Sequence, residues 1–150
     1  MRNNRYRVVL IAWLAMLVMA LPARSDVLGA HEWKHRPLLI FAAHSEITEK
    51  LQLMKELEQN ECYVKDRRMV IAEIYPVSGN LDGQVIPRGE VASLRKRFGI
   101  GGTDFTVVLL GYDGYEKYRS STQPDLQVIF SLIDTMPMRQ DEMSIRPESC

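Results

Sequence analysis

Cysteine is scarce in this chain of 150 residues, which contains only Cys62 and Cys150. Two cysteines do not make a disulfide scaffold, and a core of this size does not require one. The two thiols could still form one disulfide if the protein works in an oxidising compartment. The sequence leaves this open, because it does not show whether their Cα atoms come within reach of each other.

An apolar run long enough to span a membrane, about 20 residues, is also missing. The run Val8–Leu21 is shorter, and it follows the basic segment Met1–Arg7 and precedes the small residues Ala23 and Ser25. This pattern predicts a secretory signal peptide over residues 1–25 that is cleaved after Ser25. The alternative is an uncleaved membrane anchor. We expect a periplasmic or secreted protein with no membrane association after cleavage.

The chain has no excess of basic charge, since 19 Lys and Arg face 19 Asp and Glu. Four arginines lie in residues 1–25 and no acid does, so cleavage leaves 15 basic against 19 acidic residues and a net charge of about −4. This argues against nucleic acid and anionic membranes as partners, because both bind basic surfaces. The remaining 125 residues are enough for one domain and too few for two.

Hydrophobic periodicity predicts seven elements in the order β-α-β-α-β-β-α. Continuous apolar runs indicate strands buried on both faces, and an Asp-Gly pair between two runs indicates a hairpin. The predicted strands are 38–43, 68–75, 105–110 and 116–119, and the predicted helices are 45–59, 90–98 and 122–136. Residues 76–88 are expected to form a loop whose turn signals would suit a small hairpin.

A parallel βαβ half followed by a hairpin and a closing helix is typical of the thioredoxin-like fold. We therefore predict an α/β three-layer sandwich around a central mixed sheet of about four strands. Residues 26–36 are a polar lead-in in which Trp33 is expected to pack over the edge of the first strand. The domain covers residues 37–137, where Pro137 is expected to stop the last helix, and residues 138–150 form a charged tail without periodicity.

The thioredoxin-like fold places its reactive cysteine after the first strand, because the N-terminus of a helix lowers the pKa of a thiol. This chain has Ala43, His44 and Ser45 there, and no proline stands just before the third strand. Ordinary thiol exchange at this position is therefore excluded. We expect Ser45 to cap the helix, because a serine nucleophile needs a base and an orienting acid in fixed geometry.

Histidines and basic clusters give no clear ligand site. His31, His35 and His44 lack the tight clustering of a catalytic zinc site, so we predict no metal and no cofactor. The clusters 65–68 and 95–97 are read as solvated surface, since no glycine-rich phosphate loop lies nearby.

Four segments together resemble a bacterial family of exported domains of unknown function. They are Trp33–Ala42, Leu94–Gly99, Leu110–Gly114 and Ile133–Met143, the last of which contains a Met-Pro-Met-Arg signature. Relatives called DUDES domains recur in animal sushi-repeat and matrix-associated secreted proteins. The resemblance implies a thioredoxin- or peroxiredoxin-like fold and brings no established activity. It also implies that a missing cysteine after the first strand is ordinary for such domains.

The signature suggests that the polar segment after the last helix has a specific role. We predict that Arg139 and Glu142 dock on the domain or on a partner while Met136 and Met138 become buried. The alternative is a solvated tail, because chain ends often fray.

These observations favour a binding or interaction module without redox chemistry, more readily than an enzyme, for an unknown protein or small-molecule ligand. The predicted binding surface consists of Arg36, His44, Ser45, Arg139 and Glu142. One alternative is a divergent thiol oxidoreductase or peroxiredoxin-like enzyme that uses Cys62, Cys150 or both. Another is metal or anion binding around His44 and Arg36.

Overall fold

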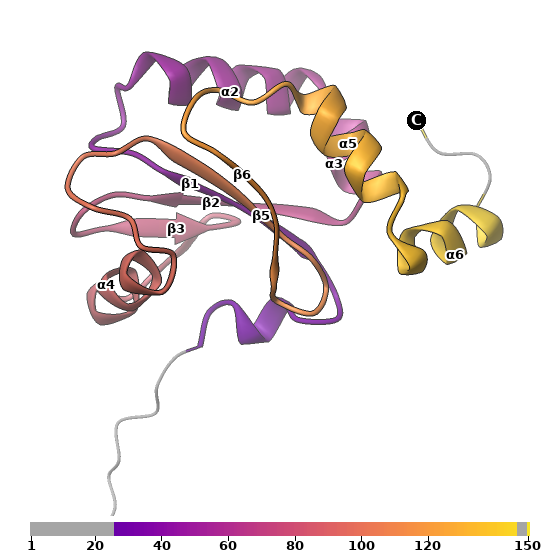
Figure 1. The fold of residues 1–150 in the computed structure, drawn as a ribbon, viewed down its shortest axis with the longest axis horizontal. Helices are drawn as coiled ribbons and strands as arrows, with labels where there is room; N and C mark the ends of the chain where they lie inside the picture. Colours follow the sequence, from indigo (N-terminus) through magenta and orange to yellow (C-terminus); the bar gives the residue numbers. More distant parts are fainter. Residues whose placement is uncertain (1–25, 147–149) are drawn as a thin grey trace, which may run out of the picture.

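The computed structural model describes residues 26–146 and residue 150, so the predicted signal peptide over residues 1–25 lies outside the described part. A six-stranded sheet forms the centre, with helices on both faces (Figure 1). The elements in chain order are η1 Gly29–His31, β1 Arg36–Phe41, α2 Thr48–Gln59, α3 Glu61–Asp66, β2 Met69–Ile74, β3 Gly79–Leu81, β4 Gln84–Val85, α4 Arg88–Arg97, β5 Thr106–Leu110, β6 Glu116–Ser120, α5 Leu126–Asp134 and α6 Pro137–Ile145.

The sheet is mixed and has the strand order β4-β3-β2-β1-β5-β6. Strands β1 and β2 are parallel, and every other neighbouring pair is antiparallel. This confirms the predicted α/β thioredoxin-like class, but the sheet has six strands and not about four. The 76–88 loop contains the additional β3–β4 hairpin, whose turn residues Asp82 and Gly83 have φ values of 50° and 78°. Two positive φ values suit the right-handed twist of a tight hairpin.

Two apolar cores lie on opposite faces of the sheet. Leu38 and Ile40 of β1 pack with α2, α3 and α5, whereas Leu39 and Phe41 pack with α4 and the η1 region. Figure 1 shows α2 and α5 on one side of the sheet and α4 on the other. Successive side chains of a strand point to opposite faces, so a strand covered on both faces needs the unbroken apolar run seen here.

Helix α2 begins later than the sequence predicted. Ser45 lies in a turn, and Ile47, with φ −63° and ψ 127°, directly precedes the helix at Thr48. The prediction that Ser45 caps this helix is therefore wrong, because the chain uses residues 42–47 to cross from the sheet to the helical layer. Helix α3 was not predicted, since its six residues are too few to show a helical period.

Most of the predicted tail forms a helix, α6 over Pro137–Ile145, contrary to the prediction. Pro137 is the first residue of α6 and does not merely end the preceding helix. A proline is well tolerated at this position because its missing N–H would have no partner within the helix. The buried residue of α6 is Arg139, so the segment has no apolar stripe from which to predict it. Helix α5 begins at Leu126, four residues after the predicted start at 122, and Asp125 caps it by accepting a hydrogen bond from the Gln127 N–H at 2.8 Å.

Candidate functional site

The loop at the carboxyl end of β1 is the position where the thioredoxin-like fold carries its reactive residue. His44 and Ser45 are both exposed there. The Ser45 hydroxyl donates to the Glu46 carboxylate at 2.9 Å and not to His44. Ser45 is thus not paired with the imidazole base that would activate it as a nucleophile.

A buried ion pair, which the sequence analysis missed, also lies near this end of the parallel strands. Lys50 Nζ is 2.5 Å from Glu73 Oε2, and the Tyr75 hydroxyl donates to the same carboxylate at 2.7 Å. Burial opposes ionisation, but the hydrogen bonds and charges within this group raise the pKa of Lys50 and lower the pKa of Glu73. Both groups stay charged at neutral pH, so this pair is poorly suited to act as a general base. The available signal was the position of Lys50 on the buried face of α2, beside Leu53 and Leu57.

The opposite end of β1 begins with Arg36, whose side chain is 1% exposed. Its guanidinium lies 3.8 Å from the centre of the Tyr112 ring and donates to the Arg67 carbonyl at 2.9 Å. It also contacts the Glu142 carboxylate, at 3.2 Å between the nearest atoms. An ion pair, a backbone acceptor and an aromatic face together compensate for burying this charge.

Glu142 is the point where these interactions converge. Besides Arg36, its carboxylate lies 3.9 Å from Arg68 Nε and 3.5 Å from Arg139 Nη1, and it accepts a hydrogen bond from the Tyr112 hydroxyl. Burial alone would raise the pKa of Glu142, but the hydrogen bonds from Tyr112 and Arg36 and the neighbouring positive charges lower it. Burial and the hydrogen bond to Glu142 raise the pKa of Tyr112 to about 12. Tyr112 therefore remains a hydrogen-bond donor at any physiological pH.

Arg139 attaches α6 to the domain. It is 3% exposed, lies 3.1 Å from Asp134, donates to the Asp66 carbonyl at 3.0 Å and pairs with the Asp66 carboxylate. Arg139 and Glu142 thus dock on the domain, which is one of the two outcomes the sequence predicted. The prediction that Met138 is buried is wrong, since it is 42% exposed, while Met136 packs partly against the α5 side of the core.

The structure divides the predicted binding surface into two parts. Arg36, Arg139 and Glu142 come together, whereas His44 and Ser45 lie beyond the other end of β1 (Figure 1). A six-residue strand separates these groups by about 20 Å. The arginine–Glu142 cluster (Arg36, Arg68, Tyr112, Arg139 and Glu142) is therefore a site distinct from the 42–47 loop.

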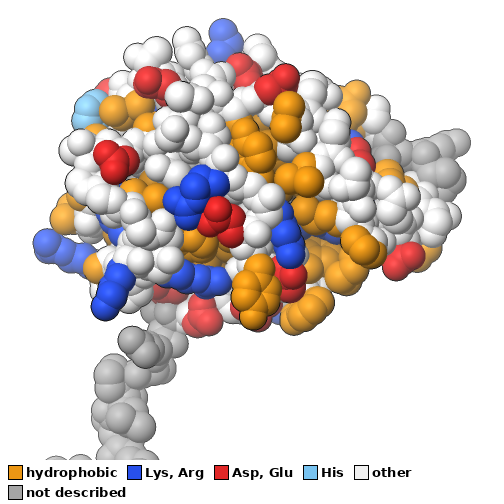
Figure 2. Space-filling view, viewed as in Figure 1, with side chains coloured by type: hydrophobic (Ala, Val, Ile, Leu, Met, Phe, Trp, Pro, Cys, Tyr) orange, Lys and Arg blue, Asp and Glu red, His pale blue; other side chains and the backbone are white. Residues whose placement is uncertain are grey.

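A hollow of about 410 Å³ adjoins the arginine–Glu142 cluster. Apolar and aromatic side chains form much of its lining, namely Trp33, Tyr112, Met136, Pro137 and Met138. Arg36 of the cluster also lines it. Trp33 is 64% exposed, so the prediction that it packs over a strand edge is wrong. Its backbone has a φ of 60° and its backbone N–H donates to the Tyr112 carbonyl at 2.8 Å. Figure 2 shows hydrophobic side chains gathered on this face between the β5–β6 turn and the α5–α6 region.

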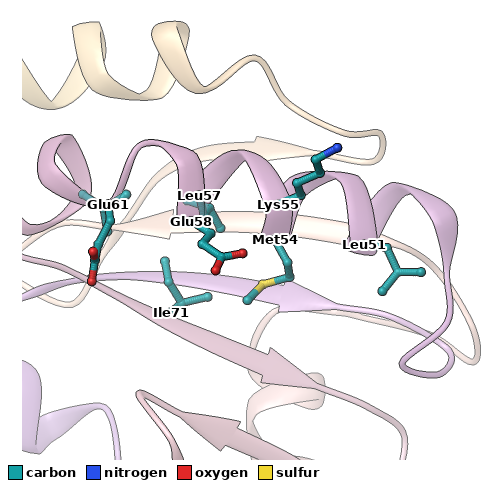
Figure 3. A pocket seen from close by; sticks show the side chains of 8 residues that line it. Leu51, Met54, Lys55, Leu57, Glu58, Glu61 and Ile71 are labelled. Atoms are coloured by element: carbon teal, nitrogen blue, oxygen red, sulfur yellow. The ribbon is translucent and has the colours of Figure 1, made fainter.

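A second hollow, of about 530 Å³, lies between α2, α3 and β2. In Figure 3, Met54 and Ile71 point toward each other across it, and Leu51 lies at one end. Lys55 and Glu58 also line this hollow.

A disulfide joins Cys62 of α3 to Cys150, with their Cα atoms 5.8 Å apart. The sequence had left this pairing open. The bond ties the C-terminal end of the chain to the helix next to the arginine–Glu142 cluster. Neither cysteine lies in the 42–47 loop.

The remaining charged clusters serve the fold. Arg95 is buried and donates to the Gly102 carbonyl at 2.6 Å, so the prediction of a solvated cluster at 95–97 is wrong for this residue. Lys96 and Arg97 are exposed, and Arg97 donates to the Gly114 carbonyl at 2.8 Å. His31 Nδ1 and His35 Nδ1 are 3.0 Å apart, and burial together with the nearby His35 lowers the pKa of His31. Within residues 26–146 and residue 150, no group of three or more potential ligands could hold a metal ion. No helix in the same residues is long and apolar enough to cross a membrane.

Solved structures share the fold at low sequence identity. A reduced 2-Cys peroxiredoxin of Plasmodium vivax superposes with a TM-score of 0.56 and 11% identity, over 82% of this chain and 74% of that one. Thioredoxin peroxidase I of Plasmodium yoelii has a TM-score of 0.53 and 13% identity, over 82% of each chain. At this identity the likeness establishes a peroxiredoxin-like fold alone.

Two sequence relatives are animal proteins much longer than this chain. Coiled-coil domain-containing protein 80 of Danio rerio is 26% identical over 138 residues, which cover 81% of this chain and 16% of the relative. Sushi repeat-containing protein SRPX of Homo sapiens is 28% identical over 96 residues, which cover 61% of this chain and 21% of the relative. The chain thus matches about a fifth or less of these relatives, and the predicted resemblance to domains of sushi-repeat proteins is confirmed.

The family match covers nearly all of the described domain, from Val27, two residues before η1, to Glu142 of the arginine–Glu142 cluster. The matching family model is described as "Domain of unknown function (DUF4174)" and spans residues 27–142. This chain therefore belongs to the DUF4174 family.

Proposed function

We propose that this protein is an exported binding module that uses a thioredoxin-like fold without thiol chemistry. The observation that carries the proposal is the separation of the cysteines from the position where the fold does its chemistry. The 42–47 loop offers only exposed His44 and Ser45, while Cys62 and Cys150 are joined to each other elsewhere. An exchange reaction needs an activated thiolate, and this loop supplies none.

The hollow beside Trp33 is the binding surface in this proposal. Trp33 and Met138 are 64% and 42% exposed at its border, although large apolar side chains are usually withdrawn from water. Aromatic and methionine side chains suit contact with varied apolar groups, because they offer large, polarisable surfaces. The ligand would therefore place an apolar group against these residues.

Export is supported by two features of different kinds. Residues 1–25 have the pattern of a signal peptide, and the disulfide is of a type that persists in oxidising compartments. Both features fit a periplasmic or secreted protein.

The binding proposal can be tested by energy transfer. Trp33 is the one tryptophan after residue 25, so its emission reports on this hollow alone. We expect the aromatic anion 1-anilinonaphthalene-8-sulfonate, whose rings are apolar, to accept energy from Trp33, and Met138→Ala to weaken the dye's binding at least threefold. Val85→Ala, on β4 at the far edge of the sheet, is the matched control because Val85 is also exposed. Equal binding by the Met138 and Val85 variants would contradict the proposed site.

A thiol oxidoreductase is the alternative, since Cys62 is exposed and its disulfide is open to attack by external thiols. Its test compares the wild-type protein with a Cys62→Ser/Cys150→Ser variant in insulin reduction and peroxide consumption. We expect the two proteins to be equally inactive. Turnover by the wild type that the double variant lacks would overturn the non-redox proposal.

A further inference from the structure

We propose that Arg36, Arg68 and Tyr112 form a carboxylate-binding site that Glu142 occupies within the chain, and that an acidic segment of a partner protein binds there by displacing Glu142. This inference rests on the proposed binding function and names the chemistry of the partner. It concerns the ionic side of the surface, whereas the hollow at Trp33 supplies the apolar side.

The seat for the carboxylate consists of Arg36, Arg68 and Tyr112, and none of these residues belongs to α6. Arg36 begins β1, Arg68 lies just before β2, and Tyr112 follows β5, so the ends of three sheet strands position them. The Arg67 carbonyl and the Tyr112 ring hold the Arg36 guanidinium independently of Glu142. The seat therefore persists when Glu142 leaves.

Arg36 also gives the seat a strong requirement for an anion. Its side chain is 1% exposed, and its Nε has no hydrogen-bond partner among the described residues. A buried cation without a counter-charge is costly, so the seat favours a new carboxylate when Glu142 departs. Arginines pair with carboxylates through parallel N–H donors, which makes the preference geometric as well as electrostatic.

Helix α6 is held mainly by ion pairs, which makes it displaceable. Its buried residue is Arg139, while Met138 and Ile145 are 42% and 77% exposed. A partner's carboxylate can replace the Glu142 carboxylate in its ion pairs, whereas the contacts of a packed apolar face would have no such replacement. The disulfide at Cys150 keeps the displaced segment attached to α3.

The position of α6 also defines the partner's shape. Pro137 and Met138 line the 410 Å³ hollow, and Arg139, Glu142 and Ile145 line another hollow of about 210 Å³. Helix α6 thus lies between the two, and its displacement would join them into one groove. The 210 Å³ hollow is also lined by Lys65, Arg68 and Arg146, so a segment with acidic residues near an apolar one fits this groove.

The first experiment is chemical rescue of a Glu142→Ala variant. Acetate should enter the vacated seat and raise the melting temperature of this variant by about 5 °C at 200 mM, relative to chloride at equal ionic strength. The wild-type protein and Glu58→Ala, which removes an exposed glutamate from α2, should show a difference below about 1 °C. Equal responses to acetate and chloride in Glu142→Ala would overturn the proposed site.

The second experiment tests exchange with a peptide that copies residues 137–145. It should bind the Glu142→Ala protein, with a change in Trp33 emission, at least tenfold more tightly than the same peptide carrying glutamine at position 142. Equal affinities would overturn the proposal. If Glu142→Ala does not fold, the peptide pair is tested against reduced wild-type protein, where equal affinities or no binding of either peptide has the same meaning.

The two proposals can fail separately. Loss of energy transfer from Trp33 to the dye in every condition, with acetate rescue intact, would leave the carboxylate site standing and remove the apolar binding function. Intact, Met138-dependent dye binding without acetate rescue or peptide discrimination would sink the carboxylate site alone.

Discussion

The two ends of strand β1 differ in how their polar groups are buried and paired. At the carboxyl end, His44 and Ser45 are exposed, and the buried Lys50–Glu73 pair neutralises itself. At the amino end, one carboxylate of Glu142 faces three guanidinium groups within 3.9 Å. The carboxyl end, where the fold can activate a nucleophile, has no thiol. The amino end holds a cluster of buried charged groups. A shared fold therefore does not show where a protein acts.

Removing the disulfide should have the largest effect on stability, and this effect should be concentrated at the amino end of β1. It links residues 88 positions apart, and cross-linking a loop of that length stabilises a protein by about 4.5 kcal/mol in the chain-entropy description. We expect Cys62→Ser to lower the melting temperature strongly and to increase amide exchange in α6 well before α2. Thermal unfolding with and without reductant measures the first effect, and hydrogen exchange the second. A uniform increase in exchange across both helices would argue against a local role at the amino end.

Arg36→Ala should have the next largest effect, a loss of about 3 kcal/mol, because it removes one partner of a buried ion pair. His44→Ala at the other end of β1 should change stability by less than about 0.5 kcal/mol, as is usual for exposed positions. Urea unfolding of the two variants measures both values. Similar losses at both ends would remove the contrast.

Acid should weaken the amino end through Glu142. Its pKa is lowered in the folded protein, so its stabilising contribution is complete above about pH 4.5 and is lost as the pH falls through the lowered value. We expect Glu142→Gln to cost about 2 kcal/mol at pH 7, as for hydrogen bonds to a charged group, and to flatten the decline in stability between pH 6 and 3. The pKa of Glu73 is also lowered, so Glu73→Gln is the matched variant for the carboxyl end. Melting temperatures across this pH range separate the two contributions.

The smallest predicted effect concerns helix starts. Asp125→Ala should cost about 1 kcal/mol, because it removes the side chain that caps α5. Ser45→Ala should cost less than about 0.5 kcal/mol, because Ser45 lies in the turn before α2 and bonds Glu46. Chemical denaturation of both variants is the measurement. A cost at Ser45 equal to that at Asp125 would mean that the 42–47 loop is more constrained than its exposure indicates.

Much of the fold was predictable because burial leaves a periodic trace. The apolar runs of β1, β2 and β5 and the stripe of α5 were all found, since each of these segments faces a core. The β3–β4 hairpin is too short to show a period, so only its turn signals indicated it. Helix α3 is also too short, and α6 buries an arginine at a position where a helical pattern has an apolar residue. The sites were harder to predict for the same reason. Tyr112 and Arg68 read as ordinary turn and surface residues until Glu142 is placed beside them.

Local periodicity and residue identity were enough to predict the fold class, the absence of a thiol after the first strand and the net charge. The packing of the whole domain was needed to show that Arg36 and Glu142, 106 positions apart, share one site. It also decided that Cys62 and Cys150 pair and that Arg36 and His44 lie apart. Ion pairs and disulfides depend on distances of a few ångströms between remote segments, and only the packing of the whole domain sets those distances.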